Sequence, residues 1–368
     1  MIAASLPRSG GGAGFLAGVL GLVVSGGFVI WQLMSLGHAA YNTTSAGLMW
    51  GLPIVTYDFL LMSSCGAAMV GALGTALGVK DFEPLARRAV WIALALLVGG
   101  VAALMLELGH PLRSLYAIPL NFQVKAPLFW KMIAVTVYGL SLLALAFGWI
   151  AKAQARPGGA ATVAGLAALV VVITGALMFA TLSMRPFWHS GEVPVMVLVE
   201  ALLGGLAFTL LAAHLAGGDD ARAASQAARW VALLSFVTLL FVVGRAIVGL
   251  ASNLDGLQVW NHVVASLPFW LQVAFLLVAL WLTGVAANRG SSGAQMLAMV
   301  LVIVALLAGK YEFVISGQLV PLFKGSWVHG LIAYSPSAAE WALLAMSAFL
   351  AYAVYAFGAA RYRLGAGR

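Results

Sequence analysis

The chain has few side chains that could move protons, and His38 and Asp58 are the pair whose types suit that task best. Imidazole titrates close to neutral pH, and a carboxylate beside it can take a proton onward. We therefore expect these two residues to accept protons from a substrate, with Tyr41 or Asn42 as the hydrogen-bond donor that orients it. The alternative for His38 is an interfacial or capping histidine without a chemical role.

A second polar group lies in the stretch from Glu107 to Lys131, ELGHPLRSLYAIPLNFQVKAPLFWK, which separates two apolar runs. Glu107, His110 and Arg113 are the second choice for a proton-exchanging site, and Arg113 could instead dock a partner. Prolines stiffen a chain because their φ angle is fixed. We expect this stretch to be an outer loop that serves as a lid and docking platform.

Four further ionisable residues fall within or near apolar runs: Glu200, Arg245, Lys310 and Glu312. A charged side chain at the centre of a bilayer costs about 2.5–3.5 kcal/mol on insertion scales, so such residues mark sites or proton paths by default. We expect these four to form either a proton path or a network of structural ion pairs. Interfacial snorkelling is the reading without a functional role.

The elements that hold these residues must cross a membrane. Hydrophobic residues make up 63% of the chain, charged residues 8%, and the mean hydropathy is +1.04. Such a composition is typical of an all-α polytopic membrane protein embedded in a lipid bilayer, here a single integral membrane domain over residues 1–368. The first apolar run is interpreted as a retained helix, with a cleaved signal peptide as the alternative. We expect about ten transmembrane helices, at residues 14–37, 55–79, 87–108, 127–151, 160–184, 193–217, 228–250, 266–287, 295–317 and 337–360.

The basic residues predict the orientation of these spans. Of the 19 lysines and arginines, twelve fall in the loops on the side of the termini and five, Lys131 among them, on the opposite side. Cytoplasmic loops carry the excess of basic residues, so both termini are expected in the cytoplasm. The net charge of +8 is then explained by the inner leaflet, and nucleic-acid binding is not expected. With this topology, His38, His110, Asp58 and Glu107 map to the outer side.

A weak repeat divides the chain. Pro53 and Pro194 lie 141 residues apart at the start of two spans, and Trp130 and Trp270 lie 140 apart. The spacing predicts two four-helix bundles, spans two to five (residues 52–184) and spans six to nine (residues 193–317), with flanking helices. Matched spans run in the same direction, so the axis relating the units would lie along the membrane normal. The offset nearly superposes Asp58 on Glu200.

Several motifs in order resemble one family. They are Trp50-Gly-Leu-Pro-Ile-Val-Thr-Tyr-Asp-Phe-Leu60, Glu107-Leu-Gly-His-Pro-Leu-Arg113, Ala126-Pro-Leu-Phe-Trp130, Pro186-Phe-Trp-His189, Tyr311-Glu-Phe-Val-Ile-Ser-Gly-Gln318 and Tyr334-Ser-Pro-Ser-Ala-Ala-Glu-Trp341. Together they resemble the polysulfide reductase membrane-subunit family, called NrfD-like or PsrC-like, over about residues 45 to 345. The chain departs from the family pattern in having His110 in place of an arginine, Lys310 in place of an arginine and Glu200 in place of a small polar residue.

The resemblance implies a quinone-reactive anchor subunit of a respiratory oxidoreductase in a bacterial cytoplasmic (inner) membrane. Such an anchor binds menaquinone or ubiquinone near the outer, periplasmic face and catalyses only the quinone half-reaction. Its implied partners are a four-cluster ferredoxin-like iron–sulfur subunit on that face and a molybdopterin catalytic subunit beyond it. His38, Tyr41, Asn42, Asp58, Glu107, His110 and Arg113 are then the expected quinone-binding residues.

The cysteine and histidine content bears on the cofactors. Cys65 is the single cysteine, so no cysteine-ligated metal or iron–sulfur centre can be built from this chain alone. We expect no haem either, because His214, the one histidine toward the cytoplasm, has no evident partner. Two alternatives stay open: a haem b anchor, which a visible spectrum with an α-band would establish, and an ion-coupled secondary transporter, for which a repeat and intramembrane charges are also expected.

Overall fold

The computed structural model describes residues 9–43, 48–113, 116, 120, 122–153, 157–252, 256–285, 291–321 and 330–365. Within these residues the fold is all-helical, with ten helices long and apolar enough to cross a membrane. The prediction of an all-α polytopic protein with ten spans is therefore confirmed. The long helices are α1 (Ser9–Leu36), α3 (Leu52–Thr75), α4 (Ala86–Glu107), α6 (Pro127–Ala144), α7 (Gly159–Ala180), α8 (Val193–Ala216), α9 (Gly218–Ser252), α11 (Leu267–Gly284), α12 (Ser292–Ser316) and α13 (Ala338–Arg361).

Shorter elements complete the chain. Residues Gly37–Ala40 and Glu83–Leu85 form 3-10 turns before and after α3, and residues Leu145–Ile150 continue α6 as a π-helical turn. A short helix, α10 (Leu257–Ala265), precedes α11 and was not expected from the sequence. Helix α9 also begins ten residues before the predicted start of its span.

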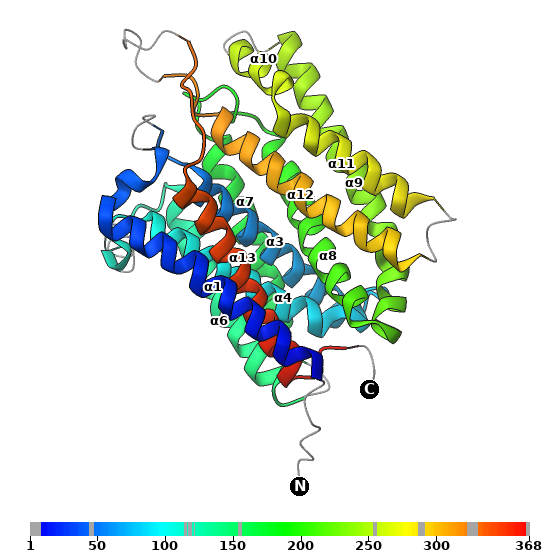
Figure 1. Cartoon of the computed structure of the whole chain (residues 1–368). Coiled ribbons are helices and arrows are strands. Elements are labelled where there is room, and N and C mark those ends of the chain that lie inside the picture. Colours follow the sequence, from blue (N-terminus) through cyan, green and yellow to red (C-terminus); the bar gives the residue numbers. More distant parts are fainter. Residues whose placement is uncertain are drawn as a thin grey trace.

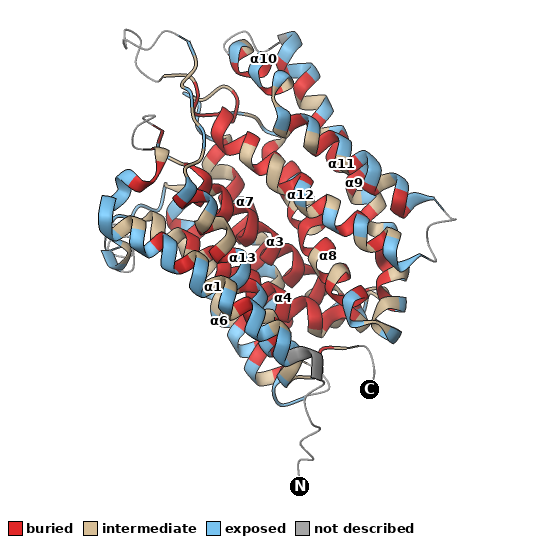
Figure 2. Ribbon diagram, in the orientation of Figure 1, coloured by how far each residue is buried: buried red, intermediate tan, exposed pale blue. Residues whose placement is uncertain are grey.

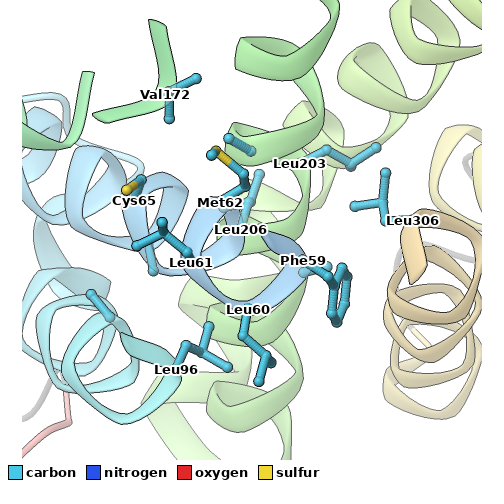
Figure 3. Packing of buried hydrophobic residues seen from close by; sticks show 14 of the residues in the cluster. Phe59, Leu60, Leu61, Met62, Cys65, Leu96, Val172, Leu203, Leu206 and Leu306 are labelled. Carbon is cyan, nitrogen blue, oxygen red and sulfur yellow. The ribbon is translucent and has the colours of Figure 1, made fainter. Parts of the chain in front are cut away.

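Helix α3 lies at the centre of the bundle. In its most apolar window 94% of the residues are buried, against 17% in α1. It packs against α4, α7 and α8, whereas α1 packs mainly against α13. Figure 3 shows Leu61, Met62 and Cys65 of α3 among side chains from α7 and α8, and Figure 2 shows buried residues concentrated in the middle helices. The outer surface of α1 therefore faces lipid, because Val23, Val24 and Met34 stay exposed there.

The arrangement gives the molecule two ends. In Figure 1 the start of α1 and the end of α13 lie at one end, and α10 lies at the other, which we call the α10 end. The end of α4, the loop after α7 and the start of α8 reach the α10 end, as does the residue 37–43 segment. The helices of the two predicted units pack internally, α3 with α4 and α11 with α12, and the units meet where α3 crosses α8. Their relation as repeats, and the membrane side of each end, stay predictions.

Candidate functional site

Helix α3 carries Asp58 into the apolar interior near the α10 end. The helix starts at Leu52 with Pro53 in its first turn, where a missing backbone N–H costs nothing. Gly51 precedes it, and a Cβ there would lie 2.5 Å from Oε1 of Glu340, so a larger residue would have to displace that carboxylate. Asp58 follows in the second turn, about 9 Å along the helix from Leu52 at 1.5 Å per residue, and is only 3% exposed.

Asp58 lies between two lysines. Its Oδ1 is 3.6 Å from Nζ of Lys131 on α6, and its Oδ2 is 3.3 Å from Nζ of Lys310 on α12. Nζ of Lys310 is also 3.6 Å from Oε2 of Glu200 on α8. All four side chains are at most 11% exposed. These contacts form a row of two lysines and two carboxylates, contributed by four helices, across the junction of the two predicted units. The row is formally neutral.

One aromatic ring lies beside each of the two ammonium groups. Nζ of Lys131 lies 5.1 Å from the ring centre of Tyr57, and Nζ of Lys310 lies 5.6 Å from that of Phe313. A ring face attracts a cation, and the attraction grows when water is absent. These contacts compensate part of the cost of burying the lysines.

The expectation that Lys131 belongs to an outer loop was wrong. Lys131 lies in the first turns of α6 and is 4% exposed. On the facing helix α7, a Cβ at Gly175 would lie 3.6 Å from Nζ of Lys131, so this glycine leaves room for the ammonium group. The available signal was its position: Lys131 follows Trp130 directly and opens an apolar run, whereas Lys125 precedes the helix and is exposed.

His38, Tyr41 and Glu107 come together at the end of α4. Nε2 of His38 is 2.9 Å from the backbone oxygen of Glu107, and the Tyr41 hydroxyl donates to the Leu106 oxygen at 3.3 Å. The rings of His38 and Tyr41 meet edge to face, with centres 5.8 Å apart. Burial raises the pKa of Tyr41, and the charges of Glu107 and Glu340 add to this rise, so its hydroxyl stays protonated and can donate.

Glu340 ties this group to α13 and α3. The buried carboxylate accepts the backbone N–H of Asn42 at 3.1 Å and the hydroxyl of Tyr334 at 2.6 Å, and it caps its own helix through Ser337. The Asn42 side chain donates to the Ser335 oxygen at 2.8 Å. The Tyr334 hydroxyl also accepts the backbone N–H of Leu52 at 2.9 Å, so the start of α3 is held against the same cluster.

The predicted residues thus fall into separate groups of contacts. His38 contacts the end of α4, whereas Asp58 contacts the lysines of α6 and α12. His110 and Arg113 are exposed and joined by a backbone hydrogen bond of 3.0 Å. Residues 114–115, 117–119 and 121 of the expected lid lie outside the described residues.

Arg245 and Glu312 have other partners. Nε of Arg245 lies 3.0 Å from Oε1 of Glu192, and its Nη2 donates to the Phe187 oxygen at 2.7 Å. Glu312 accepts hydrogen bonds from the hydroxyls of Ser266, at 2.7 Å, and Ser316. Lys310 and Glu200 therefore join Asp58, while Arg245 forms a second ion pair with a carboxylate that the sequence did not single out.

The fold and this interior together define a multi-pass membrane protein with ionisable side chains packed between its helices. Residues 41–322 match the family described as "Polysulphide reductase, NrfD", and the chain belongs to that family. The chain is also similar to a selenate reductase subunit of Mesobacillus selenatarsenatis (strain DSM 18680 / JCM 14380 / FERM P-15431 / SF-1), with 22% identity over 344 residues, 79% of this chain and 80% of the relative. Family and relative support a membrane anchor of a respiratory oxidoreductase.

Proposed function

We propose that this chain exchanges electrons between membrane quinone or quinol and an extracytoplasmic iron–sulfur subunit of a respiratory complex, with a molybdopterin subunit beyond it. The observation that carries the proposal is the buried chain of Asp58, Lys131, Lys310 and Glu200, close to the α10 end. Ionisable residues inside a membrane-spanning bundle mark substrate or proton paths by default. The name of the selenate reductase relative supports an oxidoreductase context.

Groups near the α10 end have the chemistry that a quinol head requires. Within the described residues, Oδ1 of Asp58 and Oε2 of Glu107 are buried and receive no hydrogen bond, so both can accept one from a hydroxyl group. The protonated hydroxyl of Tyr41 donates to the Leu106 oxygen and holds Tyr41 at the same end. A bound quinol supplies two electrons and two protons when it is oxidised.

In the proposed site each residue has a role set by its chemistry. His38 donates from Nε2 to the Glu107 oxygen, and this hydrogen bond holds the imidazole at the end of α4. Asp58 holds a negative charge between two ammonium groups and can accept a proton with little change of position. Lys310 and Glu200 extend this polar path into the second predicted unit, which provides a route for proton movement.

The experiment is quinol oxidation by the purified complex with a soluble quinol analogue and a dye acceptor. We expect His38→Leu and Asp58→Leu each to abolish oxidation while the iron–sulfur subunit still co-purifies. His262→Leu is the matched control, because His262 is an exposed histidine of α10 outside the proposed site. If both variants keep the wild-type rate, the site lies elsewhere in the chain.

Partner docking is tested separately at Arg113. This residue is exposed at the α10 end, beside the expected lid. We expect Arg113→Glu to weaken retention of the iron–sulfur subunit in a pull-down, and metal analysis of the co-purified subunits reports molybdenum or tungsten and iron. Unchanged retention would remove Arg113 from the docking surface.

A further inference from the structure

A cavity of about 320 Å³ opens in the second predicted unit, between the loop before α8, the last third of α9, and α10. Phe187 and Trp260 line it, with ring centres 4.8 Å apart. Leu240 and Val248 of α9 line it too, and they are 58% and 61% exposed on a membrane-spanning helix. The cavity therefore opens toward lipid, and its volume suits one ring-sized headgroup.

Polar groups lie along the edge of this cavity. Nδ1 of His189 is 2.8 Å from the Ala180 backbone oxygen, and since a carbonyl only accepts, Nδ1 carries a proton, which makes Nε2 the acceptor of the neutral ring. Nη1 of Arg245 lies 3.6 Å from the Met196 sulfur, which is a weak acceptor, so this group keeps capacity to donate. The cavity thus offers both an acceptor for a hydroxyl and a donor for a carbonyl.

The charge balance of the cavity selects the kind of headgroup. Arg245 is paired with Glu192 at 3.0 Å, and its guanidinium lies 5.3–5.5 Å from the ring centres of Phe187, Trp260 and Phe313. Although burial raises the pKa of Glu192, hydrogen bonds from Ser190 and its own backbone and the charge of Arg245 lower the pKa overall. The carboxylate stays ionised and neutralises the guanidinium. An anionic phosphate would find no excess positive charge there, whereas a neutral oxygen-bearing ring finds donor, acceptor and aromatic walls.

We propose that this cavity binds the ring of a quinone or quinol, with the apolar tail running along α9 into lipid. This would be a second site, in different helices from His38 and Asp58. Its role in the second unit would be quinone binding and not electron transfer. Beyond Arg245 a smaller cavity of about 40 Å³ is lined by Glu200, Gln272 and Glu312. The headgroup would therefore adjoin the same polar interior that holds Lys310 and Asp58.

The test fills the cavity. A Cβ at Gly244, which lines it, meets no atom within 4 Å, so the side chain of Gly244→Leu can start into the cavity without a clash at Cβ. Gly27→Leu is the matched control, because Gly27 of α1 is exposed and its Cβ also meets nothing within 4 Å. The probe is a photoreactive azidoquinone, added to the full chain in phosphatidylcholine nanodiscs, and labelled peptides are identified by mass spectrometry.

We expect label on the segments 186–192 and 240–260 of the wild-type protein and of Gly27→Leu, and a loss of about tenfold in Gly244→Leu. His189→Leu, which removes only the acceptor, should reduce the same label about threefold. Label near residues 38–58 should not change in either variant, so failure here is distinct from failure of the first-unit site.

Three results would overturn the proposal. The first is no label in these segments of the wild type, and the second is label at the wild-type level in both His189→Leu and Gly244→Leu when both elute as folded protein. The third is loss of the label in nanodiscs that contain phosphatidylglycerol. The last result would show that an anionic lipid headgroup takes the cavity.

Discussion

Asp58 and its two lysines are the most demanding contacts in the molecule. Three ionised groups in an apolar interior stabilise one another only while all are present, and removing one partner of a buried pair typically costs about 3–5 kcal/mol. Lys131 has Asp58 as its ion-pair partner within the described residues, whereas Asp58 retains Lys310. Loss of Lys131 therefore leaves Asp58 with half of its compensating charge.

We predict that Lys131→Met lowers both the thermal midpoint of the purified protein and its rate of quinol oxidation, the rate by about tenfold or more. Met fills much of the volume of the lysine stem, so the effect reports the charge. Lys125→Met is the control, because Lys125 is an exposed lysine six residues earlier in the same stretch. Equal behaviour of the two variants would mean that the buried ammonium group has no role beyond packing.

The sequence revealed which residues were unusual but not which of them meet. Asp58, Glu200 and Lys310 stand out as charges in apolar runs, and the structure places all three in one chain of contacts. The burial of Lys131 was not predicted, because a lysine at the boundary of a predicted span can equally be a loop residue whose side chain snorkels to the interface. The difference depends on the rotation of α6 toward α3 and on the space left by Gly175, which are tertiary properties.

At the scale of elements, the crossing of α3 and α8 decides how the two predicted units meet. A Cβ at Gly66 would overlap the Ala201 backbone oxygen, and a Cβ at Gly205 would overlap the backbone of Ala67. Small residues at such points let two membrane helices approach closely. This close approach brings Asp58 and Glu200 to the same lysine, Lys310.

We predict that Gly66→Ala destabilises the protein by about 1–3 kcal/mol or more, the usual range for overpacking, because the methyl group must push two backbones apart. The thermal midpoint in detergent measures the effect. Gly27→Ala should leave the midpoint unchanged or raise it slightly, since alanine favours helix and the space there is open. A midpoint of Gly66→Ala equal to that of Gly27→Ala would contradict the close crossing.

The start of α9 shows why element boundaries were less predictable than element number. Hydropathy alone locates ten spans, but the first ten residues of α9 include Asp219, Asp220 and Arg222 and therefore predict a loop. They are helical because Asp220 pairs with the buried Arg88 at 2.6 Å, and Asp219 with Asp220 suits the positive end of the helix dipole. Helix α10 was missed because of its length, since nine residues are too few for a membrane span.

Asp81 holds the same end of α9 and gives a pH prediction. A hydrogen bond from Trp230 lowers the pKa of Asp81, and Arg229 lowers it further, against a smaller rise from burial. Because the pKa is lower in the folded state, the stabilisation is present above the ordinary pKa of aspartate and is lost as pH falls through the folded pKa. We expect Asp81→Asn to lower the thermal midpoint at pH 7, and the difference from wild type to shrink below about pH 4. A difference independent of pH would show that the hydrogen bonds, not the charge, carry the effect.

At the scale of the whole molecule, the polar residues divide between the two ends by kind. The α10 end holds the residues of the proposed sites, including the Arg245–Glu192 pair, while the other end holds the pair of Arg88 with Asp220. The proposed function requires that the α10 end face the iron–sulfur partner outside the cytoplasm. The excess of basic residues in the loops at the termini predicts this orientation.

Cysteine labelling tests the orientation directly, because the single native cysteine, Cys65, is fully buried in α3 and gives little background. Ser183 lies exposed in the loop after α7 at the α10 end, and Lys80 lies exposed in the loop after α3 at the end of the termini. We expect a membrane-impermeant maleimide to label Ser183→Cys in intact spheroplasts and Lys80→Cys only after permeabilisation. The unsubstituted chain is the control. The reverse pattern would place the α10 end in the cytoplasm and would remove the proposed electron transfer to an extracytoplasmic partner, while the buried contacts of Asp58 would be unaffected.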